Sequence, residues 1–272
     1  MRIATVNVNG IRAAARKGME SWVDQSQPDV LLLQEVRADE QTAAALLPGY
    51  ETQVWPCRIK GRAGVAVALR QGSGLTFGQV RLGVAAGAEE PDVDTGRWLE
   101  VDLQGAAAPL TVISAYLHSG QVGTPKLDQK LAHLELVDAR MAQLLDAAEA
   151  GGPAVVMAGD LNVVRSQQDI KNWKPNHNKV SGVLDEEIAH LEGWFGAGWV
   201  DVARSLAGDV QGPYTWWSQR GKAFDNDAGW RIDYQVATPS AAGKARSSTV
   251  DRAPSYAERW SDHAPLVVDY DL

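Results

Sequence analysis

The fold of this chain is decided by one stretch, Val155-Val156-Met157-Ala158-Gly159-Asp160-Leu161-Asn162. Its apolar run is continuous rather than alternating, which predicts a strand that is buried on both faces. The run stops at Gly159, where the backbone can turn closely, so Asp160 and Asn162 stand at the carboxyl end of the strand. If the chain stays extended there, these two side chains point the same way and suit the holding of a water molecule. A turn that is capped by Asp and Asn is the structural alternative.

Two earlier strands are predicted to end in the same way. Arg2–Val8 is rich in β-forming residues and ends in Asn7-Val8-Asn9-Gly10, and the apolar run within Asp29–Gln34 is followed by Glu35. Open α/β sheets bind ligands outside the carboxyl ends of their strands. The polar residues that follow these three strands are therefore expected to share one site.

The rest of the chain contains more predicted strands than helices. The expected helices are Ile11–Asp24, Ala38–Leu47, Lys126–Ala150 and Asp185–Phe195. The further β-type segments are Tyr50–Trp55, Ala63–Arg70, Leu75–Leu82, Arg97–Leu103, Leu110–His118, Trp199–Val202, Tyr214–Trp217, Arg231–Ala237, Ser247–Val250 and Leu266–Tyr270. Loops are expected at Gly83–Pro91 and at the polar segment Val163–Leu184. No repeat and no linker divides the chain, so we expect a single domain over residues 1–272: a four-layer α/β sandwich of two packed mixed β-sheets flanked by helices.

The chain is acidic, but its basic residues are grouped. With 26 basic and 34 acidic residues, the net charge of −8 argues against a protein that binds nucleic acid by charge alone. No acidic residue lies between Cys57 and Arg81, however, and a second basic group lies between Arg165 and Lys179. Such groups are ordinary solvated faces unless they flank a site.

The single cysteine, Cys57, excludes an internal disulfide, and this favours the reducing cytoplasm. The N-terminal residues lack the apolar core of a signal peptide. No apolar run approaches the length of a membrane span, so we expect no contact with a membrane.

Asp233 is predicted to lie inside an apolar strand, between Ile232 and Tyr234. A buried carboxylate costs free energy unless it is paired. A histidine is the natural partner, because the carboxylate fixes its tautomer and raises its pKa. Of the five histidines, His263 is the one preceded by another acid, Asp262. A histidine with a purely structural role is the alternative.

The candidate site residues lack a cysteine cluster and paired histidines, which disfavours zinc. Their carboxylate and amide oxygens suit a hard divalent cation, Mg²⁺ or Mn²⁺. A hard metal ion, an activated water molecule and a histidine together describe the hydrolysis of a phosphate ester.

Five short motifs follow one another along the chain: Asn7–Arg12, Leu33–Glu35, Gly159–Val163, Trp230–Tyr234 and Ser261–Pro265. In these motifs and their order, the chain resembles the bacterial exodeoxyribonuclease III-type abasic-site endonucleases of the endonuclease/exonuclease/phosphatase superfamily. The resemblance covers essentially the whole chain, and the five motifs in order are specific although each alone is weak. It implies the four-layer sandwich. It also implies a Mg²⁺- or Mn²⁺-dependent phosphodiesterase that cuts duplex DNA 5′ to abasic sites and trims 3′ ends.

The resemblance also implies which residues bind the metal ion and the attacking water. Glu35 would be the principal metal ligand, with Asn9 and Asp262 near the ion. Asp160, assisted by Asn162, would hold and deprotonate the water molecule. Which group is the true general base is left open.

The other implied catalytic residues act on the phosphate. His263, oriented by Asp233, would stabilise charge on the scissile phosphate. Tyr116 would contact that phosphate or the leaving oxygen, and Asn7 would help to shape the site.

The remaining positions that match the family concern the DNA. A pocket for the flipped-out baseless sugar is implied at Trp216, Trp230 and Ile232, for which core packing is the alternative. Contacts with the DNA backbone are implied at Arg12, Lys17, Arg62, Asn172, Lys174 and Asn176. Gln121 and Arg220 lie where members of the family insert side chains into the duplex, although residues 121–125 do not align cleanly. The balance between endonuclease and exonuclease activity is therefore open.

Double-stranded DNA with an abasic site or a 3′ end is thus the expected partner. Nothing in the sequence indicates an obligate protein partner, so we expect a monomer. Two other functions stay open: an inositol-phosphate or phospholipid phosphodiesterase of the same superfamily, and a catalytically silent DNA-binding protein with this fold. The Trp-Arg-Ile-Asp-Tyr run at Trp230–Tyr234 disfavours the first, and the presence of every expected site residue disfavours the second.

Overall fold

The computed structural model describes residues 1–84 and 95–272 of the chain. The strands are β1 (Arg2–Asn7), β2 (Val30–Gln34), β3 (Tyr50–Trp55), β4 (Val65–Arg70), β5 (Thr76–Leu82), β6 (Trp98–Gln104), β7 (Leu110–Tyr116), β8 (Ala154–Asp160), β9 (Val200–Asp201), β10 (Asp233–Ala237), β11 (Ala245–Val250) and β12 (Leu266–Tyr270). The helices are α1 (Ile11–Arg16), α2 (Met19–Ser26), α3 (Glu40–Ala45), α4 (Pro125–Glu149), α5 (Trp173–Asn176), α6 (Asp185–Ala197), α7 (Val202–Ala207) and α8 (Pro239–Ala242), with 3₁₀ turns η1 (Gln167–Asp169) and η2 (Tyr256–Glu258). Most of the loop expected at Gly83–Pro91 lies outside the described residues.

The described strands form two mixed sheets of six strands each. The strand order is β11-β12-β1-β2-β4-β3 in the first sheet and β5-β6-β7-β8-β10-β9 in the second. One pair in each sheet is parallel, β1 with β2 and β7 with β8. The other pairs are antiparallel.

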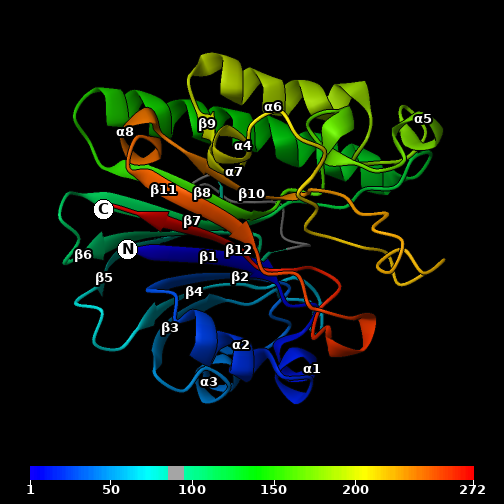
Figure 1. Cartoon of the computed structure of the whole chain (residues 1–272). Helices are drawn as coiled ribbons and strands as arrows, with labels where there is room; N and C mark the ends of the chain where they lie inside the picture. Colours follow the sequence, from blue (N-terminus) through cyan, green and yellow to red (C-terminus); the bar gives the residue numbers. More distant parts are fainter. Residues whose placement is uncertain (85–94) are drawn as a thin grey trace.

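Helices cover the outer face of each sheet. In Figure 1, α1, α2 and α3 lie along the first sheet, and α4 and α6 lie along the second. Apolar side chains fill the three interfaces: Val6 and Leu31 beneath α1–α3, Ile3 and Val156 between the sheets, and Met157 beneath α4 and α6. Each fully buried side chain of this kind contributes about 1.5–3 kcal/mol. The predicted four-layer sandwich is confirmed.

The two-residue period of a strand decides which side chains meet between the sheets. In β1, Ile3 faces the second sheet, so Asn7 faces it too. In β8, Val156 and Ala158 face the first sheet, so Asp160 does as well. Two residues that were predicted to belong to the site therefore project toward one another from different sheets.

Some elements differ from those predicted. The helix expected over Ile11–Asp24 is divided into α1 and α2, because Gly18 adopts a φ of 103°, which a helix cannot continue. The loop expected over Val163–Leu184 contains η1 and α5, and β9 is followed by α7, which was not predicted.

The aromatic strand predicted at Tyr214–Trp217 is wrong. Trp216 makes isolated β-bridges with Trp230 and His263, and the segment joins neither sheet. Tyr214 and Trp217 pack in a local apolar cluster instead, so tertiary contacts override the β-preference of the aromatic residues. Among the residues described, no helix has the length and apolar character needed to cross a bilayer.

Candidate active site

Three predicted site residues lie side by side at one end of the second sheet. In the strand register, Asp160 of β8 is paired with Tyr116 of β7 on one side and with Asp233 of β10 on the other. Gly159 permits this arrangement, because a Cβ atom at that position would lie 1.9 Å from the carbonyl oxygen of Ala115. With a φ of 151° as well, the position accepts only glycine unless β7 and β8 move apart.

The strand ends that carry the polar residues turn through left-handed backbone conformations. The φ angle is 47° at Asn9, 50° at Glu35 and 52° at Asn162, a region that residues other than glycine rarely occupy. Asx turns support two of them: the Asn9 N–H donates to Oδ1 of Asn7 at 2.9 Å, and the Asn162 N–H donates to Oδ1 of Asp160 at 3.0 Å. Such conformations cost about 1–3 kcal/mol each and cluster at functional sites.

The turn after β8 changes how Asp160 and Asn162 act together. Because the chain does not stay extended, the side chain of Asn162 does not project beside the carboxylate. Its Nδ2 donates to the carbonyl oxygen of Leu117 at 2.9 Å, and the backbone N–H of Asn162 is the group that reaches Asp160. Both residues nevertheless line the same cavity.

Asn7 joins the two sheets at the centre of the site. Its Nδ2 donates to Oε1 of Glu35 at 3.0 Å and to Oδ2 of Asp160 at 2.9 Å. Asn7 is only 1% exposed, and the hydroxyl of Ser261 donates to its carbonyl oxygen at 2.6 Å. One amide group thus holds an acid from each sheet.

A buried aspartate–histidine pair adjoins Asp160. Nδ1 of His263 lies 2.8 Å from Oδ2 of Asp233, and Nε2 lies 3.8 Å from Oδ2 of Asp160. Burial disfavours the imidazolium, but the carboxylates of Asp233 and Asp160 outweigh burial and raise the pKa of His263 to about 10. His263 is therefore a cation at neutral pH, and both of its ring nitrogens are hydrogen-bond donors.

The same surroundings change the acidity of Asp160 and Tyr116. Burial, reinforced by the charges of Asp233 and Glu35, raises the pKa of Asp160 to about 7 against the opposing effects of His263 and the amide of Asn7. Burial and the charge of Glu35 also raise the pKa of Tyr116 well above its usual range. Tyr116 is therefore a neutral hydroxyl, and it donates to Oε1 of Glu35 at 2.7 Å.

Asn9 and Trp216 hold the carboxylate of Asp262. Nδ2 of Asn9 donates to Oδ1 at 2.9 Å, and Nε1 of Trp216 donates to Oδ2 at 3.1 Å. Burial alone would raise the pKa of Asp262, but the positive charge of His263 and these two hydrogen bonds hold that pKa below its ordinary value. Asp262 is therefore ionised at neutral pH.

These side chains surround a cavity of about 560 Å³. Its lining includes the predicted residues Glu35, Tyr116, Asp160, Asn162, Asp262 and His263. Trp216, Trp230 and Ile232, the predicted sugar pocket, line it as well, together with Gln121. Asn7, Asn9 and Asp233 lie behind this surface as hydrogen-bond partners of the lining residues.

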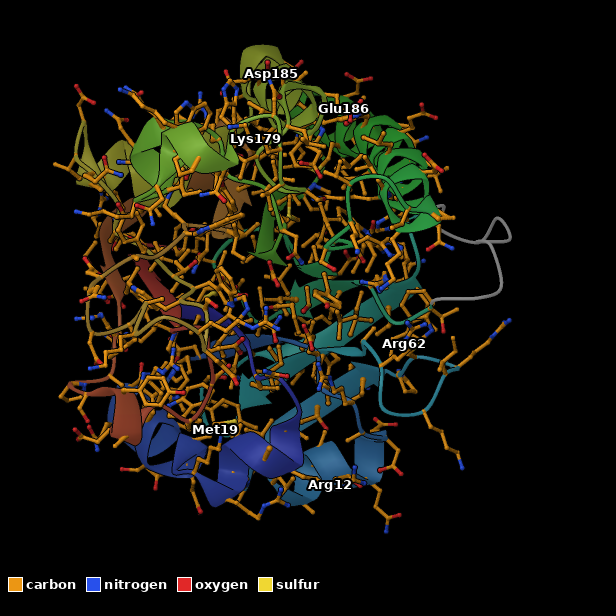
Figure 2. The ribbon with its side chains drawn as sticks, turned by 90° about the vertical axis from the view of Figure 1, so that its right-hand side faces the viewer. Arg12, Met19, Arg62, Lys179, Asp185 and Glu186 are labelled. Atoms are coloured by element: carbon orange, nitrogen blue, oxygen red, sulfur yellow. The ribbon has the colours of Figure 1, made fainter. Side chains whose placement is uncertain are left out.

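The other residues predicted to contact DNA lie outside the cavity. Arg12, Lys17, Arg62, Asn172, Lys174 and Arg220 are exposed, and Asn176 is half-buried. Figure 2 shows the side of the molecule at which the strands that carry the site residues end. Arg12 and Arg62 lie on the side of the first sheet, and Lys179 lies on the side of the second. Asn172 and Lys174 line a separate hollow of about 360 Å³ beside Trp173. Their contact with DNA stays a prediction.

Two groups of side chains have the chemistry of a metal site. Asp160, Asp233 and His263 offer atoms within 4.8 Å of one another, but the hydrogen bond between Asp233 and His263 already uses two of these groups. Glu35 and Asp262 line the cavity, with Asn9 beside Asp262. Their carboxylate and amide oxygens form the donor set that a hard divalent cation prefers, so the residues present fit such an ion.

Sequence reasoning missed two cationic side chains at the site. The guanidinium of Arg37 is bonded to Oε2 of Glu35 and balances its charge. Lys130 is fully buried behind the cavity, and its Nζ donates to the carbonyl oxygen of Asn162 at 2.9 Å. A signal for Lys130 was present, because it lies on the apolar stripe of its helix, with leucines three residues before and four residues after it. No comparable signal marks Arg37.

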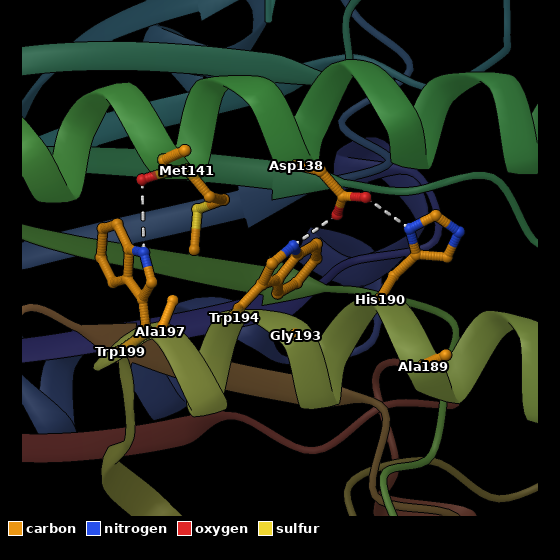
Figure 3. A pocket seen from close by; sticks show the side chains of 9 residues that line it. Asp138, Met141, Ala189, His190, Gly193, Trp194, Ala197 and Trp199 are labelled. Atoms are coloured by element: carbon orange, nitrogen blue, oxygen red, sulfur yellow. Dashed lines mark hydrogen bonds and ion pairs between the residues drawn. The ribbon is translucent and has the colours of Figure 1, made fainter.

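A second hollow, of about 390 Å³, lies between α4 and α6 (Figure 3). Its carboxylate, Asp138, is bonded to Nδ1 of His190 and to Nε1 of Trp194, each at 2.6 Å. Nε1 of Trp199 donates to the carbonyl oxygen of Met141 at 3.3 Å. The carboxylate of Asp138 and the two indole N–H groups are therefore bonded within the protein.

Comparison with known proteins agrees with the fold. The sequence profile of the Endonuclease/Exonuclease/phosphatase family matches residues 4–263, and the chain belongs to this family. An exodeoxyribonuclease from Bacillus subtilis (strain 168) is 30% identical over 268 residues, which cover 98% of each chain. A DNA-(apurinic or apyrimidinic site) endonuclease from Dictyostelium discoideum is 29% identical over 276 residues, which cover 100% of this chain and 71% of that protein. The structure of an AP endonuclease from Archaeoglobus fulgidus has a TM-score of 0.82 with 26% identity and covers 100% of both chains. The resemblance seen in the five motifs is confirmed.

Proposed function

We propose that this chain is a DNA-repair nuclease that cuts duplex DNA on the 5′ side of an abasic site and leaves a 3′-hydroxyl group. It also removes nucleotides or blocking groups from 3′ ends. The observation that carries the proposal is the convergence of Glu35, Asp160 and His263 from both sheets on one cavity, with Asn7 between the two acids. Acids, a histidine cation and an aromatic wall together suit a phosphodiester beside a sugar that lacks its base.

The relatives support a DNA substrate and a single catalytic unit. The Dictyostelium discoideum protein is an endonuclease for apurinic or apyrimidinic sites, and the Bacillus subtilis protein is an exodeoxyribonuclease. Both match nearly all of this chain, so the proposed catalytic domain comprises residues 1–272. The proposal includes a monomer, since one chain supplies the lining of the cavity. It also includes a cytoplasmic location, which the single cysteine favours.

Asp160 is proposed to hold the attacking water molecule and to accept its proton. The N–H of Asn162 and the amide of Asn7 each bond one of its two carboxylate oxygens, so the group has a fixed orientation. A pKa of about 7 allows it to accept a proton near neutral pH. The neighbouring His263 cation stabilises its ionised form.

His263, oriented by Asp233, is proposed to stabilise negative charge on the scissile phosphate. The bond from Nδ1 to Asp233 directs the second N–H away from that carboxylate and toward the Asp160 side of the cavity. A fixed cation in a buried site stabilises developing charge without reorganisation. Tyr116, as a neutral hydroxyl, can donate to the phosphate or to the leaving oxygen.

Glu35, Asn9 and Asp262 are proposed to hold Mg²⁺ or Mn²⁺, because they supply the oxygen ligands that these ions prefer. When bound, such an ion neutralises charge on the phosphate and makes a coordinated water molecule more acidic. Arg37 is bonded to Glu35, so this guanidinium and the ion compete for the same carboxylate.

Trp216, Trp230 and Ile232 are proposed to form the pocket for the baseless sugar. The two indole rings meet edge to face, with centroids 5.6 Å apart and an interplanar angle of 80°. A narrow apolar wall of this kind admits deoxyribose and excludes a nucleotide that still carries its base. The polar residues in and around the cavity that are proposed to contact the DNA are Arg12, Lys17, Arg62, Gln121, Asn172, Lys174, Asn176 and Arg220.

An abasic-duplex assay tests the proposal. A labelled duplex with one abasic-site analogue is incubated with Mg²⁺, with Mn²⁺ or with EDTA, and the products are resolved by length and end group. We expect a metal-dependent nick 5′ to the analogue, and a loss of about a thousandfold in turnover for Asp160→Asn. Asp138→Asn is the matched control, because it alters a carboxylate outside the cavity, and it should cleave at the wild-type rate.

No metal-dependent nick by the wild-type protein, or equal nicking by Asp160→Asn, contradicts the proposal. Turnover of a soluble inositol phosphate without DNA cleavage would instead identify a small-molecule phosphodiesterase. Tight binding of the duplex without cleavage under any divalent ion would identify a silent DNA-binding protein.

A further inference from the structure

Behind the cavity lies an ion pair that the catalytic assignments do not use. Nζ of Lys130, on α4, is 2.6 Å from Oε1 of Glu187, on α6, and both side chains are 0% exposed. The desolvation of a buried ion pair often offsets its attraction, so an apolar pair of similar size is frequently as stable. The presence of charge here therefore calls for an explanation other than overall stability.

Each member of the pair also holds other segments of the chain. Nζ of Lys130 donates to the carbonyl oxygen of Asn162 at 2.9 Å, and it lies 3.5 Å from the carbonyl oxygen of Ser119 and 3.4 Å from Oγ of Ser181. An ammonium group has three directed donors. The short contacts with Glu187 and Asn162 take one donor each, and the third is shared by the longer contacts with Ser119 and Ser181.

Both carboxylate oxygens of Glu187 also have hydrogen-bond partners besides Lys130. Its Oε1 is 2.6 Å from Oγ of Ser181, and its Oε2 accepts from the N–H groups of Gly182 and Leu184. The pair thus joins the segment after β7, the turn after β8 and the segment that leads into α6.

The same segments approach one another closely at two glycines. A Cβ atom on Gly120 would lie 2.3 Å from Oγ of Ser181, and one on Gly182 would lie 2.7 Å from the carbonyl oxygen of Asn162. At so short a distance one of the two groups must shift, and at Gly182 the group that the Cβ atom would meet is backbone. The two segments are therefore in direct contact at the ion pair.

The outer sides of the same segments form part of the cavity wall. Ser119, Gln121 and Val122 line the cavity from the first segment, and Lys179, Val180 and Ser181 line it from the second. Val122 and Val180 are 44% and 39% exposed, so this part of the wall has little apolar packing of its own and depends on the bonds behind it.

We propose that Lys130 and Glu187 are positioning residues that set the spacing of segments 119–122 and 179–182, and with it the width of the substrate cavity. The inference rests on the proposed function, because it assigns the cavity to the DNA substrate. An apolar pair could fill the same volume, but it would leave the carbonyl oxygen of Asn162 without its donor and would not fix the direction of either segment.

The double variant Lys130→Met/Glu187→Gln tests the proposal. It removes both charges at nearly constant volume, and the glutamine can still accept from Gly182 and Leu184 and donate to Ser181. The single variants leave one buried charge unpaired and should melt at a lower temperature than the double variant. The matched control is Arg140→Met/Glu100→Gln, which removes another ion pair of α4, with N–O 2.7 Å, from residues that do not line the cavity.

Two readouts separate positioning from folding. In the folded double variant, backbone hydrogen exchange in peptides covering 117–122 and 179–184 should accelerate about tenfold or more, with exchange in β8 unchanged. The ratio of kcat/KM for an abasic duplex to kcat/KM for an undamaged 3′ end should fall about tenfold or more. A smaller folded fraction lowers both constants equally and leaves this ratio unchanged. The control variant should change neither readout.

Unchanged exchange in both segments overturns the inference, and so does accelerated exchange with an unchanged substrate ratio, since the pair would then serve local stability alone. If the wild-type protein cleaves neither substrate, the proposed function fails instead. The hydrogen-exchange result still decides whether the pair holds the two segments together.

Discussion

The substitution Asn7→Ala removes the amide group that bonds both Glu35 and Asp160. A hydrogen bond to a charged group contributes about 1.5–3 kcal/mol, and we take about 2 kcal/mol for the bond to Asp160. Asn7 is 1% exposed, so bulk water does not replace the lost donor. The ionised form of Asp160 loses this stabilisation, whereas the protonated form does not.

The expected result is a change in pH dependence rather than a uniform loss of rate. With the pKa of Asp160 at about 7, a loss of about 2 kcal/mol moves the acidic limb of the rate profile upward by about 1.5 pH units. The rate then falls about fifteenfold at pH 7 and less than about twofold at pH 9.

The assay is kcat/KM for the abasic duplex between pH 6 and pH 10, at constant ionic strength and saturating divalent ion. The control is Gln235→Ala, which removes a buried amide that bonds the carbonyl oxygens of Ile3 and Leu266 and the hydroxyl of Tyr270. None of these partners lines the cavity. It should lower stability without moving the acidic limb. An equal loss at pH 7 and pH 9 for Asn7→Ala, or the same displacement of the limb in the control, would refute the reasoning.

Three further outcomes are expected. Asp233→Asn removes the charge that contributes most to the raised pKa of His263, so the alkaline limb of the pH–rate profile should move downward from about pH 10. We also expect kcat to fall by about 10²- to 10⁴-fold. An unchanged alkaline limb would speak against the pairing of Asp233 with His263. Arg37→Met frees Glu35 from its guanidinium partner, so calorimetric titration should show Mn²⁺ binding about threefold to tenfold tighter. Equal or weaker binding would contradict a competition between Arg37 and the metal ion for Glu35. Arg62→Ala should weaken DNA binding about equally for all sequences and reduce the slope of log Kd against log salt concentration by about 1, as measured by fluorescence anisotropy; an unchanged slope removes Arg62 from the DNA-binding face.

Much of the fold could be predicted because its signals are local. The apolar runs at Val30–Gln34 and Ala154–Asp160 indicate buried strands by continuity, and the leucine spacing in Pro125–Glu149 indicates a helix by its period. The prediction failed at Tyr214–Trp217, where residue type favoured a strand but the aromatic side chains pack in a cluster of their own. It failed also in Ile11–Asp24, where a single glycine conformation divides the helix.

The candidate site could be predicted as a set of residues but not as a geometry. The polar residues that follow β1, β2 and β8 were visible in the sequence, yet their turns have positive φ angles that carry no sequence signal at Glu35. As a result, the side chain of Asn162 bonds Leu117 rather than standing beside Asp160. The register of β8 with β10, which aligns Asp160 with Asp233, likewise appears only once the sheet has formed.

By itself, the sequence determined most of the strands, the polar residues at their ends and the chemistry that those residue types support, because periodicity and composition are local properties. Only the tertiary structure decided that one amide holds Glu35 and Asp160, that Arg37 balances Glu35 and that Lys130 meets Glu187. The bond from Asn7 to Asp160 joins residues 153 positions apart. Contacts at such separations depend on how two sheets pack and on how the chain turns at their edges, and residue identity alone specifies neither.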